Sequence, residues 1–186
     1  SSNTSRILVV HKEAIDERRL PLLQVADLFQ RIQIAIPTIH SVDADLGIIE
    51  VEDLGDETLE TAVRETAHES ESRATYEKAV SIIVGLQRGG RLLQESGYKM
   101  CNSAFDKARL LFELQFFLEQ FIEKHRQTTV SEKARSAIME EFSVLASEIA
   151  NEPRVVCHRD FHSRNLMKHR QQLYVIDFQD TRLGPD

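Results

Sequence analysis

The sequence predicts an α+β protein with two lobes, a sheet-containing piece over residues 1–54 and a mostly helical piece over residues 55–186. Short runs rich in β-branched residues dominate the first fifty positions. After an acidic connector at 52–56, the apolar residues instead recur at helical spacing. With 186 residues, 41% of them hydrophobic, the chain can bury a sizeable core and fits one domain or a small two-lobed unit.

The N-terminal piece is predicted to contain a small sheet and one helix. Residues 21–33 carry apolar side chains at helical spacing, and Pro21 suits the first turn of a helix. We expect Pro37 to end this helix. The predicted strands are residues 7–11, 38–42 and 47–51, the last two joined by a hairpin turn at 43–46.

Four helices are predicted after the connector, and one of them is apolar nearly all round. Residues 105–124 hold five of the nine phenylalanines, a pattern typical of a helix inside a larger helical lobe. We therefore expect these rings to be core residues rather than a ligand site. Gly89 and Gly90 weaken the second helix, and Ser131 suits the N-cap of the fourth. The predicted elements are helices at 57–70, 76–93, 105–124 and 131–151, then strands at 154–157 and 173–176.

Charge and cysteine content narrow the class of protein. The chain has 23 basic and 30 acidic residues, a net charge of −7, so it has no general electrostatic reason to bind nucleic acid or an anionic membrane. Cys101 and Cys157 do not make a disulfide framework in a chain of this length, and Cys157 is expected to be a small buried side chain. No targeting segment and no apolar run of membrane-spanning length is present, so we expect a cytoplasmic protein.

The most informative residues are Asp160, Asn165 and Asp177, which two short apolar strands present. Phosphoryl transfer uses one carboxylate to take a hydroxyl proton, and an Asn and an Asp to hold Mg²⁺ on the phosphates of ATP. Oxygen ligands of this kind suit Mg²⁺. If the two strands pair as a hairpin, residues 165 and 177 come together. Asp180 is a further ligand or a group that orders the loop.

An isolated Asp in a loop is usually a turn or cap residue, so the set as a whole carries the interpretation. His158 is expected to orient the loop through hydrogen bonds rather than to act as a base or ligand. His162 and Arg164 either face the phosphates or substrate, or are solvated loop residues.

The segments His158-Arg-Asp-Phe-His-Ser-Arg-Asn165 and Ile176-Asp-Phe-Gln-Asp180 resemble the aminoglycoside phosphotransferase and choline kinase branch of the protein-kinase-like fold. Within this branch, the two segments are most similar to those of bacterial kinases that phosphorylate N-acetylmuramate and N-acetylglucosamine. The resemblance implies that Asp160 is the catalytic base and that Asn165 and Asp177 hold Mg²⁺. It also implies that the connector residues Glu52, Asp53 and Leu54 meet the adenine of ATP.

The sequence departs from this family at its ends. No glycine-rich phosphate loop precedes Ile7, and His11 stands where an ATP-contacting lysine is expected. Lys12, one place later, is the candidate for that lysine, although a one-residue offset reverses the face of a strand. The chain stops just past the proposed metal site, which predicts a protein-kinase-like fold truncated at both ends, with an incomplete N-terminal sheet.

The resulting hypothesis is an ATP- and Mg²⁺-dependent kinase that phosphorylates a hydroxyl of a small molecule, most simply a sugar or amino sugar. An aminoglycoside phosphotransferase is the first alternative, because a polycationic acceptor could use the acidic stretches at 65–71 and 140–141. A non-catalytic nucleotide-binding module is the second, because the phosphate loop is missing. The absence of an Ala-Pro-Glu signature after Asp177 disfavours a protein kinase. The sequence does not indicate an oligomeric state.

Overall fold

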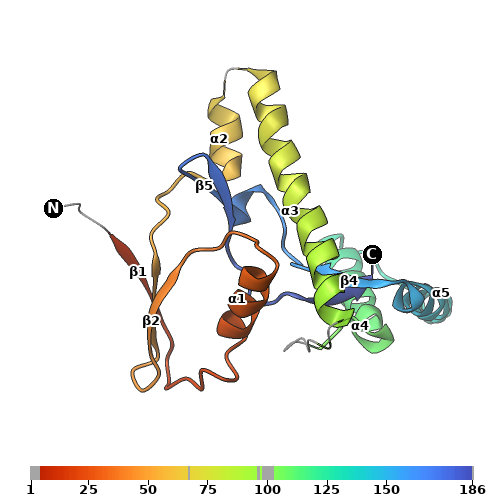
Figure 1. Cartoon of the computed structure of the whole chain (residues 1–186). Coiled ribbons are helices and arrows are strands. Elements are labelled where there is room, and N and C mark those ends of the chain that lie inside the picture. The colour runs from red at the N-terminus through yellow and green to blue at the C-terminus, as the bar shows by residue number, and fades with distance from the viewer. Residues whose placement is uncertain (1–4, 67, 96, 98–102, 186) are drawn as a thin grey trace.

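A three-stranded antiparallel sheet forms the N-terminal part of the molecule in a computed structural model that describes residues 5–66, 68–95, 97 and 103–185 (Figure 1). Its strands are β1 (Arg6–Val10), β2 (Ile39–Asp43) and β3 (Ile48–Glu52), in the order β1-β3-β2. All three predicted strands are confirmed to within one residue at each end. Cys101, considered above for disulfide formation, lies outside the described residues.

Helix α1 (Pro21–Arg31) belongs to the N-terminal segment in sequence but packs against the C-terminal elements. The ring of Phe29 is fully buried, and its centroid lies 5.4 Å from that of Phe178. Just after the helix, the carbonyl of Ala35 accepts from the N–H of Val175 at 2.8 Å. Figure 1 shows α1 between the sheet and the C-terminal elements, so one core joins both parts of the chain.

The end of α1 was predicted wrongly. The helix stops at Arg31, well before Pro37, because Gln33 adopts a left-handed conformation with φ of 59°. The N–H of Ile34 then closes the last turn by donating to the carbonyl of Phe29 at 2.9 Å. A left-handed residue after the last turn is a common helix ending, but it is usually Gly or Asn, so Gln33 gave no signal.

The predicted helices at 57–70 and 76–93 are also corrected. Helix α2 (Leu59–Glu65) is short, capped by the side chain of Thr58, and ends where Thr66 turns to an extended conformation. Helix α3 (Glu69–Glu95) begins seven residues earlier than predicted and continues through Gly89 and Gly90. No Gly or Pro marks the break between α2 and α3, so the prediction placed the break several residues too late, at 71–75.

Helix α4 (Lys107–Phe117) continues into a π-helical segment, η1 (Leu118–His125), and packs against α5 (Glu132–Asn151). The N-cap role of Ser131 is confirmed, because its side chain accepts from the N–H of Ala134. The expectation that the phenylalanines here are core residues is wrong in the described structure. Four rings are about half exposed and stack on neighbouring rings along the helix: Phe112, Phe116, Phe117 and Phe121.

Two small two-stranded sheets carry the predicted catalytic segment. Strand β4 (Arg154–Cys157) pairs with β7 (Arg182–Pro185), and β5 (Leu166–His169) pairs with β6 (Gln172–Val175). Strands β4 and β6 therefore do not form a hairpin with each other, which corrects the prediction. Among the described residues, no helix is both long enough and apolar enough to cross a membrane.

Candidate active site

The catalytic loop leaves strand β4 from the core and ends at an exposed carboxylate. Val155 and Val156 in β4 are buried, and His158 is only 3% exposed, whereas Asp160 is exposed. Between them, Arg159 has a φ of 82°, a conformation that L-residues rarely adopt. Such strain persists only where the surroundings fix it, and it is common at functional sites. The loop therefore presents Asp160 from a rigid support.

His158 joins the loop to the segment that carries Asp177. Its Nε2 lies 3.0 Å from the carbonyl oxygen of Ile176, which can only accept, so Nε2 carries the proton. Burial is the main cause that lowers the pKa of His158, and the neutral ring is favoured. The prediction that His158 orients the loop is confirmed.

Asn165 lies at the centre of the hydrogen bonds that hold the site together. Its side-chain Nδ2 donates to the carbonyl of Asp160 at 3.0 Å, and its own carbonyl accepts from the N–H of Ile176 at 3.1 Å. The short helix η2 (Ser163–Asn165) positions it at the start of β5. With Nδ2 engaged, the side-chain oxygen Oδ1 is the atom available to a cation.

Asp177 follows directly after β6 and Ile176. Its φ is 59°, and its Oδ1 accepts from Nε2 of Gln179 at 2.8 Å. Asp tolerates the left-handed region better than most residues. The next residue, Phe178, is buried against Phe29, so the turn that presents this exposed carboxylate is anchored in the core.

These residues fit a Mg²⁺ ion that is shared with nucleotide phosphates. No group of three or more His, Cys, Asp or Glu side chains suited to a metal occurs in the part of the chain that the structure describes. Mg²⁺ in such sites usually takes one or two protein oxygens and completes its shell with phosphates and water. Oδ1 of Asn165 and the carboxylate of Asp177 would supply that number.

A cavity of about 610 Å³ lies between the N-terminal sheet and the segment that carries Asp177. Its lining is largely apolar at the sheet and connector end and acidic at the other, where Asp177 and Asp180 line it. A flat apolar base and a phosphate chain with bound cations need surfaces of these two kinds. The apolar lining residues are Ile7, Val9, Leu20, Pro21, Leu22, Pro37, Ile39, Val51, Leu54, Met167, Ile176 and Phe178.

The predicted nucleotide contacts are only partly at this cavity. Glu52 and Leu54 line it, whereas Asp53 and Lys12 are not among its lining residues. Lys12 is exposed, and the neighbouring His11 lines the cavity instead. Nε2 of His11 is buried and has no hydrogen-bond partner among the described residues, so it offers an unsatisfied polar atom to a ligand.

The connector is fixed by hydrogen bonds from both sides. The N–H of Thr38 donates to the carboxylate of Glu52 at 3.1 Å, and this bond is the main cause that lowers the pKa of Glu52. The N–H of Gly55 donates to Asp53 at 2.8 Å and likewise lowers the pKa of Asp53. Nδ1 of His169 lies 3.0 Å from the carbonyl of Leu54, which ties β5 to the connector.

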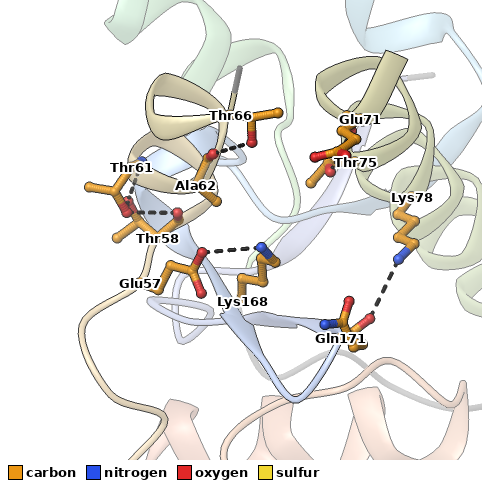
Figure 2. A network of polar contacts seen from close by, with 10 residues as sticks. All are labelled: Glu57, Thr58, Thr61, Ala62, Thr66, Glu71, Thr75, Lys78, Lys168 and Gln171. Atoms are coloured by element: carbon orange, nitrogen blue, oxygen red, sulfur yellow. Dashed lines mark hydrogen bonds and ion pairs between the residues drawn. The ribbon is translucent and has the colours of Figure 1, made fainter. Parts of the chain in front are cut away.

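The hairpin formed by β5 and β6 is also bonded to the segment just before α2 and to α3, as Figure 2 shows. Nζ of Lys168 lies 3.1 Å from a carboxylate oxygen of Glu57, and the N–H of Lys168 donates to the carbonyl of Glu57 at 2.8 Å. At the hairpin tip, Nζ of Lys78 on α3 donates to the carbonyl of Gln171 at 3.5 Å. Asn165 precedes this hairpin and Asp177 follows it, so these ties help to fix both.

Several residues that line the cavity were not among the predicted site residues. Ile7 and Val9 alternate along β1 and line the cavity with His11, a period-two pattern that the sequence contained. Met167 lines it from β5, a strand that was not predicted, and Ile39 lines it from the strand that was predicted over residues 38–42.

A family model described as "Phosphotransferase enzyme family" matches residues 4–185. The chain is 32% identical over 167 residues to an N-acetylmuramate/N-acetylglucosamine kinase of Neisseria meningitidis, a match that covers 89% of this chain and 47% of that protein. The chain thus spans about half the length of the curated relatives it matches.

Solved structures resemble this fold at low sequence identity. The ADP-bound aminoglycoside phosphotransferase APH(2'')-Ib superposes with a TM-score of 0.58 at 17% identity, covering 97% of this chain and 61% of that one. Choline kinase LicA from Streptococcus pneumoniae superposes with a TM-score of 0.57 at 13% identity, covering 100% and 59%. These likenesses confirm the predicted α+β fold, which resembles that of the protein kinases.

Proposed function

Because the chain belongs to the phosphotransferase enzyme family, as its motifs predicted, we propose that it is an ATP- and Mg²⁺-dependent kinase acting on a hydroxyl of a small molecule. The observation that carries the proposal is the hydrogen-bonded set of Asp160, Asn165 and Ile176, which connects the catalytic loop to Asp177 at the acidic end of the cavity. Family membership supports phosphotransfer, and the ADP-bound structural relative supports an adenine nucleotide.

Each residue has a role in this proposal. The apolar cavity binds the adenine, with Glu52, Asp53 and Leu54 in the connector beside it. Asn165 and Asp177 would hold Mg²⁺, which neutralises the charge of the phosphates when it is bound. Asp160, exposed at the end of a rigid loop, accepts a hydrogen bond from the acceptor hydroxyl and then takes its proton as the new phosphate ester forms.

A sugar or amino sugar such as N-acetylmuramate or N-acetylglucosamine is the proposed acceptor. The relative from Neisseria meningitidis, which bears both sugars in its name, supports this choice. We place the proposed kinase in the reducing cytoplasm, where Cys157 would stay in the thiol form.

One observation favours the alternative of a non-catalytic nucleotide-binding module. No lysine is among the described lining residues of the cavity, and Lys12 is exposed. A cation on the phosphates is a usual part of a kinase site. Calorimetry with ATP, with and without Mg²⁺, tests this alternative. A non-catalytic module should bind ATP in a Mg²⁺-dependent manner and show no turnover.

The proposed function is tested by ADP release from Mg-ATP with a panel of amino sugars, aminoglycosides, choline and homoserine. We expect at least one sugar to raise ADP release, and Asp160→Asn to lower that rate by about 10²–10⁴-fold. Asp45→Asn is the matched control, because Asp45 is exposed in the turn between β2 and β3. Turnover that no acceptor stimulates, or that survives Asp160→Asn, would remove the kinase assignment.

A further inference from the structure

Guanidinium groups gather around one aromatic ring beside the catalytic loop. The guanidinium carbons of Arg159 and Arg182 each lie 5.5 Å from the ring centroid of Phe105. Arg154 donates to the carbonyl of Phe105 at 2.6 Å. Arg159 directly precedes Asp160, so this cluster adjoins the proposed catalytic base.

Few negative charges balance this cluster. Among the described residues, the guanidiniums of Arg109, Arg159 and Arg182 have ion pairs to only two carboxylates, those of Glu113 and Asp180. Nη2 of Arg159 lies 3.9 Å from Glu113, and its Nη1 lies 3.7 Å from Asp180. Nη2 of Arg182 is also 3.7 Å from Asp180. These distances exceed those of hydrogen bonds, so the contacts of the two arginines to carboxylates are long. The hydrogen bonds of Arg182 go to backbone carbonyls instead, from Nε to Asp180 at 3.2 Å and from Nη1 to Ser103 at 3.4 Å.

Burial makes the imbalance significant. The side chain of Arg182 is 12% exposed and that of Arg159 is 22% exposed. Burial, followed by the like charges of Arg159 and Arg109, lowers the pKa of Arg182. Poorly hydrated guanidiniums of this kind bind carboxylates in a bidentate manner with particular strength.

The cluster also has a defined position relative to the reaction. Arg159 adjoins Asp160, and Asp180 lines the acidic end of the cavity while it pairs with Arg159 and Arg182. Glu113 extends the cluster to α4, away from the nucleotide cavity, of which it is not a lining residue. A group bound here would therefore belong to the acceptor, which must approach Asp160.

We propose that Arg159 and Arg182 bind a carboxylate carried by the acceptor, so that the preferred substrate is an anionic sugar. This inference rests on the proposed function and narrows it. N-acetylmuramate and N-acetylglucosamine are suitable probes, because they share a ring and differ by an ether group that ends in a carboxylate. The bound carboxylate replaces the loose contacts of the guanidiniums to Glu113 and Asp180.

The test uses Arg182→Gln and Arg182→Lys in the full-length protein, because Arg182 is outside the catalytic loop. We expect kcat/KM for N-acetylmuramate to fall by about 10- to 100-fold in Arg182→Gln, the loss of a charged hydrogen bond. The value for N-acetylglucosamine should fall far less. Arg182→Lys keeps the positive charge but not the paired N–H donors of the guanidinium. We therefore expect it to lower kcat/KM by an intermediate factor, and only for the anionic sugar.

Arg73→Gln is the control, since Arg73 is an exposed arginine that pairs with Glu77 on α3. The proposal would be overturned if Arg182→Gln melts like the wild type and loses kcat/KM equally for both sugars. If equal losses of kcat/KM for the two sugars are accompanied by a higher KM for ATP, the guanidiniums act on the phosphates of ATP instead. If Arg182→Gln does not fold, Arg182→Lys decides by the same comparison.

Binding separates failure of this inference from failure of the proposed function. Calorimetry with each sugar reports the carboxylate site even if neither sugar is phosphorylated. Tighter binding of N-acetylmuramate that Arg182→Gln abolishes would support the site while the kinase assignment fails. Equal affinity for the two sugars in the wild-type protein would overturn the inference, whatever the turnover.

Discussion

The N–H of Ile176 donates to the carbonyl oxygen of Asn165 at 3.1 Å, across the base of the hairpin formed by β5 and β6. The carbonyl of Ile176 in turn accepts from the ring of His158. Both polar backbone groups of the residue before Asp177 are therefore bonded to the catalytic segment. These two hydrogen bonds fix the start of the turn that presents Asp177.

Asp177→Asn should remove the charge of the proposed metal ligand with little change in the fold. Asn tolerates the left-handed φ of 59° that Asp177 adopts, so the backbone conformation is retained. We expect turnover at a fixed Mg²⁺ concentration to fall by at least about 100-fold, because several kcal/mol of charge stabilisation is lost. Titration of the rate with Mg²⁺ checks this. An unchanged Mg²⁺ requirement would show that Asp177 does not hold the metal.

His158 should make the stability of the protein depend on pH. Burial lowers its pKa in the folded state, whereas an unfolded histidine titrates near pH 6.5, so the unfolded state binds more protons between the two pKa values. The stabilising contribution is present above about pH 6.5 and is lost as the pH falls through the lowered pKa. Urea denaturation of the wild type at about pH 7.5 and 5.5 measures this loss.

The variant His158→Gln separates this effect from other titrating groups. Its amide can still donate to Ile176, but it does not titrate, so the difference in free energy of unfolding between the two pH values should shrink. His68→Gln, at an exposed histidine beside α3, is the control and should leave that difference as in the wild type. The same pH dependence in His158→Gln and the wild type would contradict the assignment.

His11→Ala and Lys12→Ala distinguish two candidates for the nucleotide contact at the end of β1. His11 lines the cavity with a buried and unpaired Nε2, whereas Lys12 is exposed. We expect His11→Ala to raise the Kd for Mg-ATP by about tenfold, the loss of roughly one hydrogen bond. Lys12→Ala should change it less. Calorimetry measures both, and the opposite order would restore Lys12 as the nucleotide contact.

Gly90→Ala should destabilise the protein through a single contact. A Cβ at Gly90 would lie 2.8 Å from Cβ of Val156, at the crossing of α3 and β4. Overpacking of this kind lowers stability by about 1–3 kcal/mol. Gly85→Ala is the matched control, because its Cβ would meet only the flexible end of Ile34 at 3.1 Å, and helix propensity offsets that contact by about 1 kcal/mol.

Urea denaturation of both glycine variants checks the comparison. Because Val156 leads into the catalytic loop, we also expect Gly90→Ala to lose turnover at a temperature where Gly85→Ala retains it. Equal stability of the two variants would mean that α3 moves away from β4 without loss.

Local chemistry made part of this structure predictable. Ser131 capped its helix as expected, and the N-terminal strands followed their β-branched residues. Strand pairing was harder, because the partner of β4 is Arg182–Pro185, a segment whose Gly-Pro end does not indicate a strand. The packing of Phe29 on Phe178 likewise depends on a contact between residues almost 150 positions apart.

The candidate site shows the same division. Asp160, Asn165 and Asp177 could be selected from their spacing and residue types, because phosphoryl transfer needs those groups. The cluster around Phe105 could not, because Arg159 and Glu113 come from separate elements and their ion pair appears only in the folded chain. Sequence therefore indicates the groups that act on phosphate more readily than the groups that select an acceptor.

The β5–β6 hairpin should tolerate insertions at its tip but not deletions within its strands. Its base lies between Asn165 and Asp177, while its two-residue tip, Arg170 and Gln171, has positive φ at both positions. A single deletion within either strand would reverse the faces of the residues beyond it. An insertion at the tip leaves the base untouched. The tip is therefore the natural point for a reporter peptide, placed outside the active centre yet connected to both proposed metal ligands through regular strands.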